Sequence, residues 1–247
     1  MILKDNVIQL RAKSALLIYL GSFGGGILIA AILGGAICFL CPGHLGFDIG
    51  TEEGVLSCFK ATRIHSEVIF IIISVISILT LSFFLVRSQL KDRTINGAAW
   101  VLGSRRELVT GLFIGLLIAT AFLIMRNVNI SNLTILKYRD LSLIFQFLAI
   151  VYTIIFVTVV PAFEELLYRG IILGGFNCSF GPIYEGILTT LLFIGMHIPS
   201  IITSGTFLFI AICSLSLTTL WIRLKTGAVG PAIAIHFSYN FIVAIYS

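Results

Sequence analysis

Three charged side chains occur within one six-residue segment inside an otherwise apolar stretch of this sequence. Glu164, Glu165 and Arg169 lie in the segment 141–173, which otherwise reads as a membrane-spanning helix. A charge at the centre of a bilayer costs at least about 2 kcal/mol, so such side chains usually face a partner or a water-filled cavity. Residues four apart share a helix face, so we expect Glu165 to pair with Arg169. Glu164 points about 100° away from Glu165, so different partners are expected for the two carboxylates.

Two further apolar segments carry polar residues at helical spacing. They contain Phe193-x-x-x-His197 and His236-x-x-x-Asn240, and the spacing places His236 and Asn240 on one helix face. Counting about 1.5 Å per residue from the segment ends places Glu164 roughly 16 Å, His197 roughly 21 Å and His236 roughly 14 Å deep. The sequence therefore predicts one polar layer near the middle of the membrane.

These side chains suffice for hydrolysis of a peptide bond by activated water. Glu164, the carboxylate without an expected cation, would take a proton from water, and His197 would orient the water or share its proton. His236 and the amide of Asn240 would donate hydrogen bonds to the oxyanion that develops on the substrate carbonyl. No covalent nucleophile is needed.

Composition determines which elements must position these residues. The chain has 247 residues, of which 58% are hydrophobic and 11% charged, and soluble domains carry about 25% charged residues. We therefore expect an all-α, polytopic integral membrane protein with a polar cavity inside the membrane. Seven spans, with an eighth as the alternative, are predicted at 15–41, 68–86, 108–125, 141–173, 183–198, 207–221 and 228–246.

The spans divide into a scaffold half and a site half within one transmembrane domain, 1–247. Residues 1–140 are predicted to be a helical scaffold, and residues 141–247 to carry the site, because polar residues inside spans gather after residue 160. Small residues let helices approach closely in a membrane. This role is expected of Gly111 with Gly115, and around the cavity of Gly170, Gly174, Gly195 and Ala232.

Basic residues predict the orientation of the chain. The net charge of +5 is carried by loops, so it indicates topology rather than nucleic-acid binding. Lysine and arginine favour the cytoplasmic side, which places the N-terminus, the loop 87–107 and the turn at 223–226 there. The C-terminus is then outside. The first apolar run is too long for a signal peptide, so a retained helix is expected.

The three motifs E-E-x-x-x-R, F-x-x-x-H and H-x-x-x-N, in this order on separate spans, resemble those of the CAAX protease and bacteriocin-processing family of intramembrane glutamic endopeptidases. The matching residues are Glu164, Glu165, Arg169, Phe193, His197, His236 and Asn240. The resemblance covers about residues 145–247. It implies that Glu164 and His197 activate water and that His236 and Asn240 form the oxyanion site, with Glu165, Arg169 and Phe193 in support.

The same resemblance implies a protease that needs no cofactor. Eukaryotic family members trim the last three residues from prenylated CAAX proteins, and bacterial members are linked to bacteriocin self-immunity or peptide-signal maturation. The expected partners are therefore a peptide or protein substrate, lipidated or not, and membrane lipids. The compact chain without a sorting signal favours the bacterial inner membrane.

Three other functions remain open on the sequence. Two histidines and a carboxylate are a zinc ligand set, although the H-E-x-x-H arrangement is absent. Intramembrane Glu and His chains also serve as proton relays in transporters, although no repeated half is visible. A non-enzymatic immunity or scaffold protein could keep the fold without turnover. The variant Glu164→Gln distinguishes the transporter and the scaffold from a protease, and metal removal followed by zinc addition tests the zinc site.

Overall fold

The computed structural model describes residues 12–40, 76, 78, 80, 101–127 and 143–246. Every regular element in these ranges is a helix, which confirms the all-α prediction for this part of the chain. The chain divides into two compact units, one of residues 17–88 and one of residues 1–16 and 89–247. The predicted site lies wholly in the second unit.

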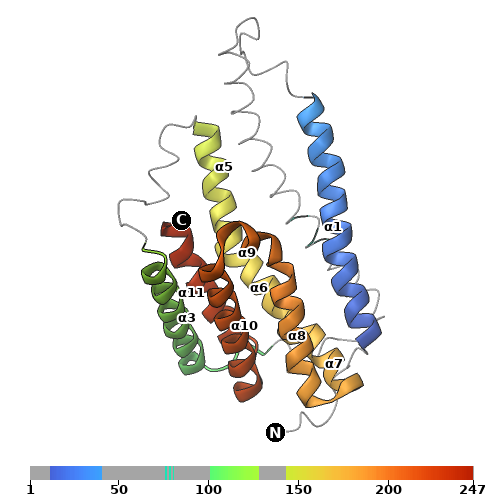
Figure 1. Cartoon of the computed structure of the whole chain (residues 1–247), viewed down its shortest axis with the longest axis vertical. Coiled ribbons are helices and arrows are strands. Elements are labelled where there is room, and N and C mark those ends of the chain that lie inside the picture. The colour runs from blue at the N-terminus through green and yellow to red at the C-terminus, as the bar shows by residue number, and fades with distance from the viewer. Residues whose placement is uncertain are drawn as a thin grey trace, which may run out of the picture. The chain divides into compact units, whose positions relative to one another are not determined.

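The described helices coincide closely with predicted spans (Figure 1). Helix α1 covers the first span. The second unit contains α3, then a run of five consecutive helical segments, and finally α8 to α11. Their bounds are α1 Ala12–Leu40, α3 Arg105–Met125, α5 Leu143–Ile154, η3 Ile155–Val159, α6 Val160–Glu165, η4 Leu166–Ile172, α7 Leu173–Phe180, α8 Pro182–Met196, α9 Ile198–Ser204, α10 Thr206–Thr226 and α11 Gly230–Tyr246.

Part of the predicted topology lies outside the described residues. Of the span 68–86, only residues 76, 78 and 80 are described, and they are helical. In the described ranges, Arg105–Met125, Ile150–Asn177 and Thr206–Thr226 are long and apolar enough to cross a membrane. The bent pair of α8 and α9 is a fourth candidate if it forms one span, and α11 is a shorter apolar helix. The count of seven or eight spans stays a prediction.

Helix α11 is the central element of the second unit. It has its most extensive contact with α3 and also packs on α10, α6 and η3, and Figure 1 shows α3, α11 and α10 side by side. Gly115 makes the close approach to α3 possible, because a Cβ atom there would overlap the Ser238 hydroxyl and the Ile235 carbonyl of α11. The predicted role of Gly111 and Gly115 in close packing is confirmed, since a Cβ on Gly111 would also press on α11.

The predicted role in close helix packing is wrong for two glycines near the site. A Cβ atom added to Gly174 or Gly195 would have no heavy atom of another described element within 4 Å. These glycines therefore do not bring helices together. Ala232 of α11 is fully enclosed, as expected of a small residue at a helix contact.

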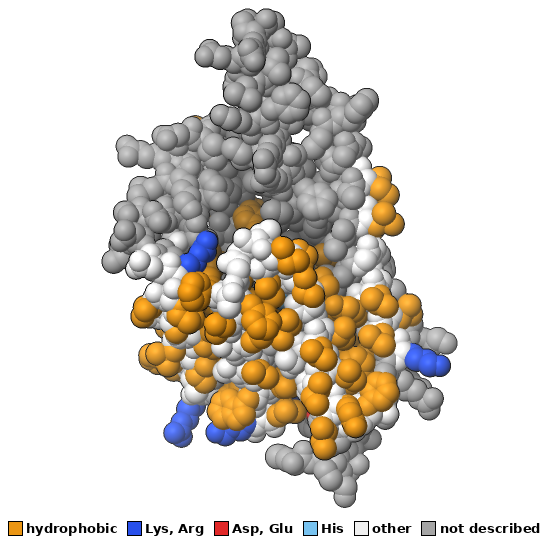
Figure 2. All heavy atoms as spheres, viewed as in Figure 1, with side chains coloured by type: hydrophobic (Ala, Val, Ile, Leu, Met, Phe, Trp, Pro, Cys, Tyr) orange, Lys and Arg blue, Asp and Glu red, His pale blue; other side chains and the backbone are white. Residues whose placement is uncertain are grey.

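Apolar side chains cover the outside of the second unit. On the face in Figure 2, the described side chains are mainly hydrophobic, and the Lys and Arg side chains lie at the margins. Phe113 and Leu117 of α3, Leu191 of α8 and Leu217 of α10 are more than half exposed. A soluble protein seldom exposes apolar side chains so continuously, whereas the hydrocarbon core of a bilayer accommodates them.

Candidate active site

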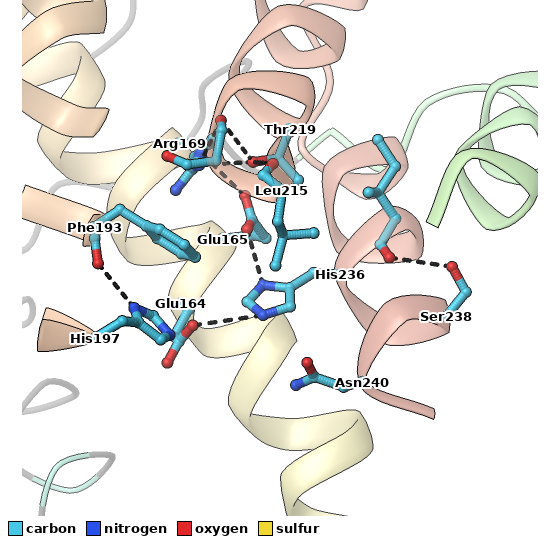
Figure 3. A network of polar contacts seen from close by, with 12 residues as sticks. Glu164, Glu165, Arg169, Phe193, His197, Leu215, Thr219, His236, Ser238 and Asn240 are labelled. Carbon is cyan, nitrogen blue, oxygen red and sulfur yellow. Dashed lines mark hydrogen bonds and ion pairs between the residues drawn. The ribbon is translucent and has the colours of Figure 1, made fainter. Parts of the chain in front are cut away.

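His236 lies between the two adjacent carboxylates. Its Nδ1 atom is 3.0 Å from Glu165 Oε1, and its Nε2 atom is 3.7 Å from Glu164 Oε2. Figure 3 shows the ring of His236, from α11, placed between two side chains of α6. The expectation of different partners for Glu164 and Glu165 is therefore wrong for His236, because one imidazole presents a nitrogen to each carboxylate, while Arg169 pairs with Glu165.

Arg169 fixes the inner carboxylate. Its Nε atom is 3.2 Å from Glu165 Oε2, and both side chains are fully buried. This contact is an ion pair without hydrogen-bond alignment. The guanidinium also donates through Nη2 to the Ser216 carbonyl at 2.9 Å and to the Thr219 hydroxyl at 2.6 Å on α10. The predicted Glu165–Arg169 pair is confirmed, and α10 supplies hydrogen bonds to the Nη2 atom of this buried cation.

Phe193 is the apolar centre of the site. Its ring is fully buried on α8. The ring centroid is 4.5 Å from the guanidinium carbon of Arg169. The ring centroids of His197 and His236 are 4.8 Å and 5.8 Å away. A cation over an aromatic face is attracted by the ring quadrupole. Phe193 thus separates the buried ion pair from His197 and fixes the spacing of the two histidines.

His197 occupies a break between two helices. Its backbone, at φ −94° and ψ 0°, separates α8 from α9, which diverge by 56°. Pro199 explains the break, because proline has no N–H for the Gly195 carbonyl and its ring would collide with an uninterrupted turn. The ring Nδ1 atom donates to the Phe193 carbonyl at 2.8 Å. In the neutral ring this leaves Nε2 as a hydrogen-bond acceptor.

Asn240 bonds to the helix that carries the carboxylates. Its Nδ2 atom donates to the Phe156 carbonyl at 3.2 Å. That carbonyl lacks its α-helical donor, because the Val160 N–H bonds to Ile155, five residues back. The next N–H would belong to residue 161, which is proline and has none. Asn240 therefore satisfies a carbonyl that η3 and Pro161 leave open.

One comparison with known proteins covers the part of the chain that carries this site. Residues 146–242 match the family model described as type II CAAX prenyl endopeptidase Rce1-like. This matched part, the Rce1-like domain, is similar to that family and covers less than half of the chain. It begins in α5, ends in α11 and contains all seven predicted site residues. No curated protein and no solved structure matches the chain. With its apolar helices, the protein is a multi-pass integral membrane protein, and its matched part is similar to CAAX proteases.

The Rce1-like domain also contains supporting residues that the sequence motifs missed. Ser216, Thr219 and Arg223 of α10 are buried and contact Arg169. Their spacing of three and four residues is the signal that could have found them, since it marks one helix face. Arg223 was counted as a topological charge in a turn, which is wrong: it lies in α10 and its side chain is 5% exposed.

A metal site requires several ligands that converge on one point. Within the described residues of the Rce1-like domain, no three His, Cys, Asp or Glu side chains are placed to hold a metal ion together. The zinc alternative is therefore tested by treating the protein with a zinc chelator.

Proposed function

We propose that the protein is an intramembrane endopeptidase in which Glu164 activates water, without a metal. The observation that supports this most is the contrast between two neighbouring carboxylates. Glu165 is fully buried and is held by Arg169 and His236, whereas the Glu164 side chain is 14% exposed and, among the described residues, pairs with no arginine or lysine. A general base must be reachable by water and must have an oxygen to spare. Glu164 meets both requirements.

In the first step, Glu164 takes a proton from water while the water oxygen attacks the carbonyl carbon of the scissile peptide bond. His197 accepts a hydrogen bond from the same water through Nε2, which its Nδ1 contact with Phe193 leaves available. The carbonyl π electrons move onto oxygen and give a tetrahedral oxyanion. Glu164 then returns the proton to the leaving nitrogen as the C–N bond breaks, so the carboxylate is regenerated.

His236 and Asn240 would stabilise the oxyanion. The Asn240 amide has two N–H groups, and the Phe156 carbonyl uses one. His236 faces Glu165 with Nδ1 at hydrogen-bond distance, while Nε2 lies 3.7 Å from Glu164 and is not held by a hydrogen bond. The proposed oxyanion site therefore consists of the Asn240 amide and the Nε2 atom of His236.

The substrate class that we propose is a peptide or protein segment, with or without a lipid anchor, that enters from the bilayer. The apolar exterior of α3, α8 and α10 suits surrounding lipid, and the family includes prenyl endopeptidases. A bacterial inner-membrane location with bacteriocin-related or other peptide substrates is part of this proposal.

Hydrolysis in H₂¹⁸O tests the mechanism. Purified protein in nanodiscs is incubated with membrane-inserting peptides, including a prenylated C-terminal peptide and its unprenylated match, and the products are analysed by mass spectrometry. We expect ¹⁸O in the new C-terminal carboxylate and none in Glu164 after one turnover. Label in Glu164, or a peptide–enzyme adduct, would show covalent catalysis by the carboxylate instead.

Chelation belongs to the same experiment. Cleavage is expected to survive treatment with a strong zinc chelator, because no step is assigned to a metal. Activity that disappears with the chelator and returns with zinc would replace this mechanism by a metalloprotease mechanism. If wild-type protein cuts none of the peptides, the proposed function loses its support.

A further inference from the structure

Two π-helical turns flank the adjacent carboxylates. α6, which ends with Glu164 and Glu165, lies between η3 and η4 in one helical run. A π turn shifts one backbone hydrogen bond from four to five residues back, which leaves a carbonyl without its α-helical donor. The run therefore contains one such carbonyl on each side of the carboxylates.

The second of these carbonyls belongs to Arg169 itself. In an α-helix it would accept from the N–H of Leu173, but that N–H bonds to Tyr168, five residues back. Arg223 of α10 replaces the lost donor: its Nε atom donates to the Arg169 carbonyl at 3.0 Å. Both arginine side chains are buried. A buried carbonyl without a donor is costly, so this contact stabilises η4 against reversion to a regular helix.

A relay of contacts connects Arg223 with Glu164. Arg223 holds the backbone of Arg169, whose guanidinium holds Glu165 at 3.2 Å. Glu165 holds His236 at 3.0 Å, and His236 faces Glu164. A change in the winding of η4 rotates Arg169 relative to Glu165, and each later contact in the relay shifts with it.

We propose that Arg223 is a positioning residue of the site: it holds the π turn that sets the Arg169–Glu165–His236 relay around Glu164. This inference rests on the proposed endopeptidase function for its kinetic consequence. Charge balance supports it, because the buried carboxylate of Glu185 on α8 interacts electrostatically with the Arg223 guanidinium. A buried arginine with a carboxylate beside it can remain in place as a backbone donor.

Two substitutions at Arg223 separate the effect of its hydrogen-bond donor from the effect of its positive charge. In Arg223→Gln the amide nitrogen is as many bonds from Cα as the arginine Nε, so the hydrogen bond to Arg169 can form without the charge. Arg223→Met has a methyl group at the same point and no donor. Both variants leave Glu185 without its cation, so the difference between them reports the hydrogen bond alone. Lys225→Met removes an exposed charge from the same end of α10 and is the matched control.

We expect Arg223→Met to lower kcat by about 10- to 100-fold with little change in KM, because misplacement by about 1 Å has effects of this size. Arg223→Gln should stay within about threefold of wild type, since a neutral donor preserves the contact. Lys225→Met should not differ from wild type. Equal losses in the Gln and Met variants would assign the effect to charge and overturn the inference, as would full activity of Arg223→Met.

The ¹⁵N chemical shifts of the His236 ring provide a readout that needs no substrate. They are assigned by comparison with His236→Ala, and they report which ring nitrogens carry protons. We expect Arg223→Met to change them and Arg223→Gln to preserve them. If the chemical shifts change in Arg223→Met and are preserved in Arg223→Gln, but the protein has no peptidase activity, the relay is supported and only the proposed function is refuted. Unchanged shifts in Arg223→Met would refute the relay itself.

Discussion

At the scale of single residues, the site assigns different work to two chemically similar carboxylates. Glu165 is enclosed by Arg169 and His236, while Glu164 is partly exposed and pairs with no arginine or lysine in the described part of the chain. Glu165 therefore has a structural task, because removal of its charge would leave the buried Arg169 cation uncompensated. Glu164 makes few structural contacts and is available for catalysis. Adjacent positions on one helix differ in function because their surroundings differ.

The identities of the site residues could be predicted from sequence, but several of their partners could not. Spacing of four residues predicts the Glu165–Arg169 pair, and three motifs on separate spans predict a shared polar layer. The shared partner His236 was missed because helical angles alone do not show where a third helix inserts a ring. Ser216, Thr219 and Arg223 were missed because hydroxyl groups and a helix-end arginine have common explanations in a membrane segment.

At the scale of elements, the winding of one helical run determines where the carboxylates point. Hydropathy predicts a helix at 141–173, and the structure has helical backbone from 143 to 180. The π turns η3 and η4 were not predicted, because their extra residue is stabilised by donors from other helices. Pro161 is the one local signal, since it cannot supply the N–H that η3 would use.

A double-mutant cycle tests the coupling of Pro161 with Asn240. Asn240→Ala should destabilise the protein by about 1 kcal/mol or more, because it leaves the Phe156 carbonyl open. In the Pro161→Ala background, residue 161 regains an N–H, and the same substitution should cost less. Thermal unfolding in detergent measures both costs. Equal costs in the two backgrounds would show that the proline does not create the need for Asn240.

At the scale of the whole molecule, a helix of the predicted scaffold half supports the site. α3 carries none of the proposed catalytic residues, yet it makes the most extensive contact with α11, which holds His236 and Asn240. This contact depends on Gly115, where the α11 backbone leaves no room for a side chain. The sequence predicted this glycine spacing as close packing, but it could not show which helix is the partner, because many helix pairs tolerate the same spacing.

A methyl group at this contact should affect both stability and catalysis. Gly115→Ala is expected to destabilise the protein by about 1 to 3 kcal/mol through overpacking, and to lower kcat because α11 moves with His236. Gly174→Ala is the control, since that position is open, and it should be neutral or stabilising by up to about 1 kcal/mol. Unfolding midpoints and cleavage rates are measured on both variants. Similar results for the two would argue against a tight α3–α11 contact.

The most direct measurement of the central claim is a comparison of Glu164→Gln with Glu165→Gln for cleavage rate and unfolding midpoint in one preparation. We predict that Glu164→Gln lowers kcat by at least about 100-fold with an unfolding midpoint close to wild type, whereas Glu165→Gln lowers the midpoint because it leaves Arg169 uncompensated. Glu107→Gln, at a partly exposed carboxylate that caps the start of α3, controls for loss of a charge and should retain kcat, because glutamine can keep the capping hydrogen bond. Cleavage by Glu164→Gln at the wild-type rate, or a biological effect of the protein that survives this substitution, would contradict the account.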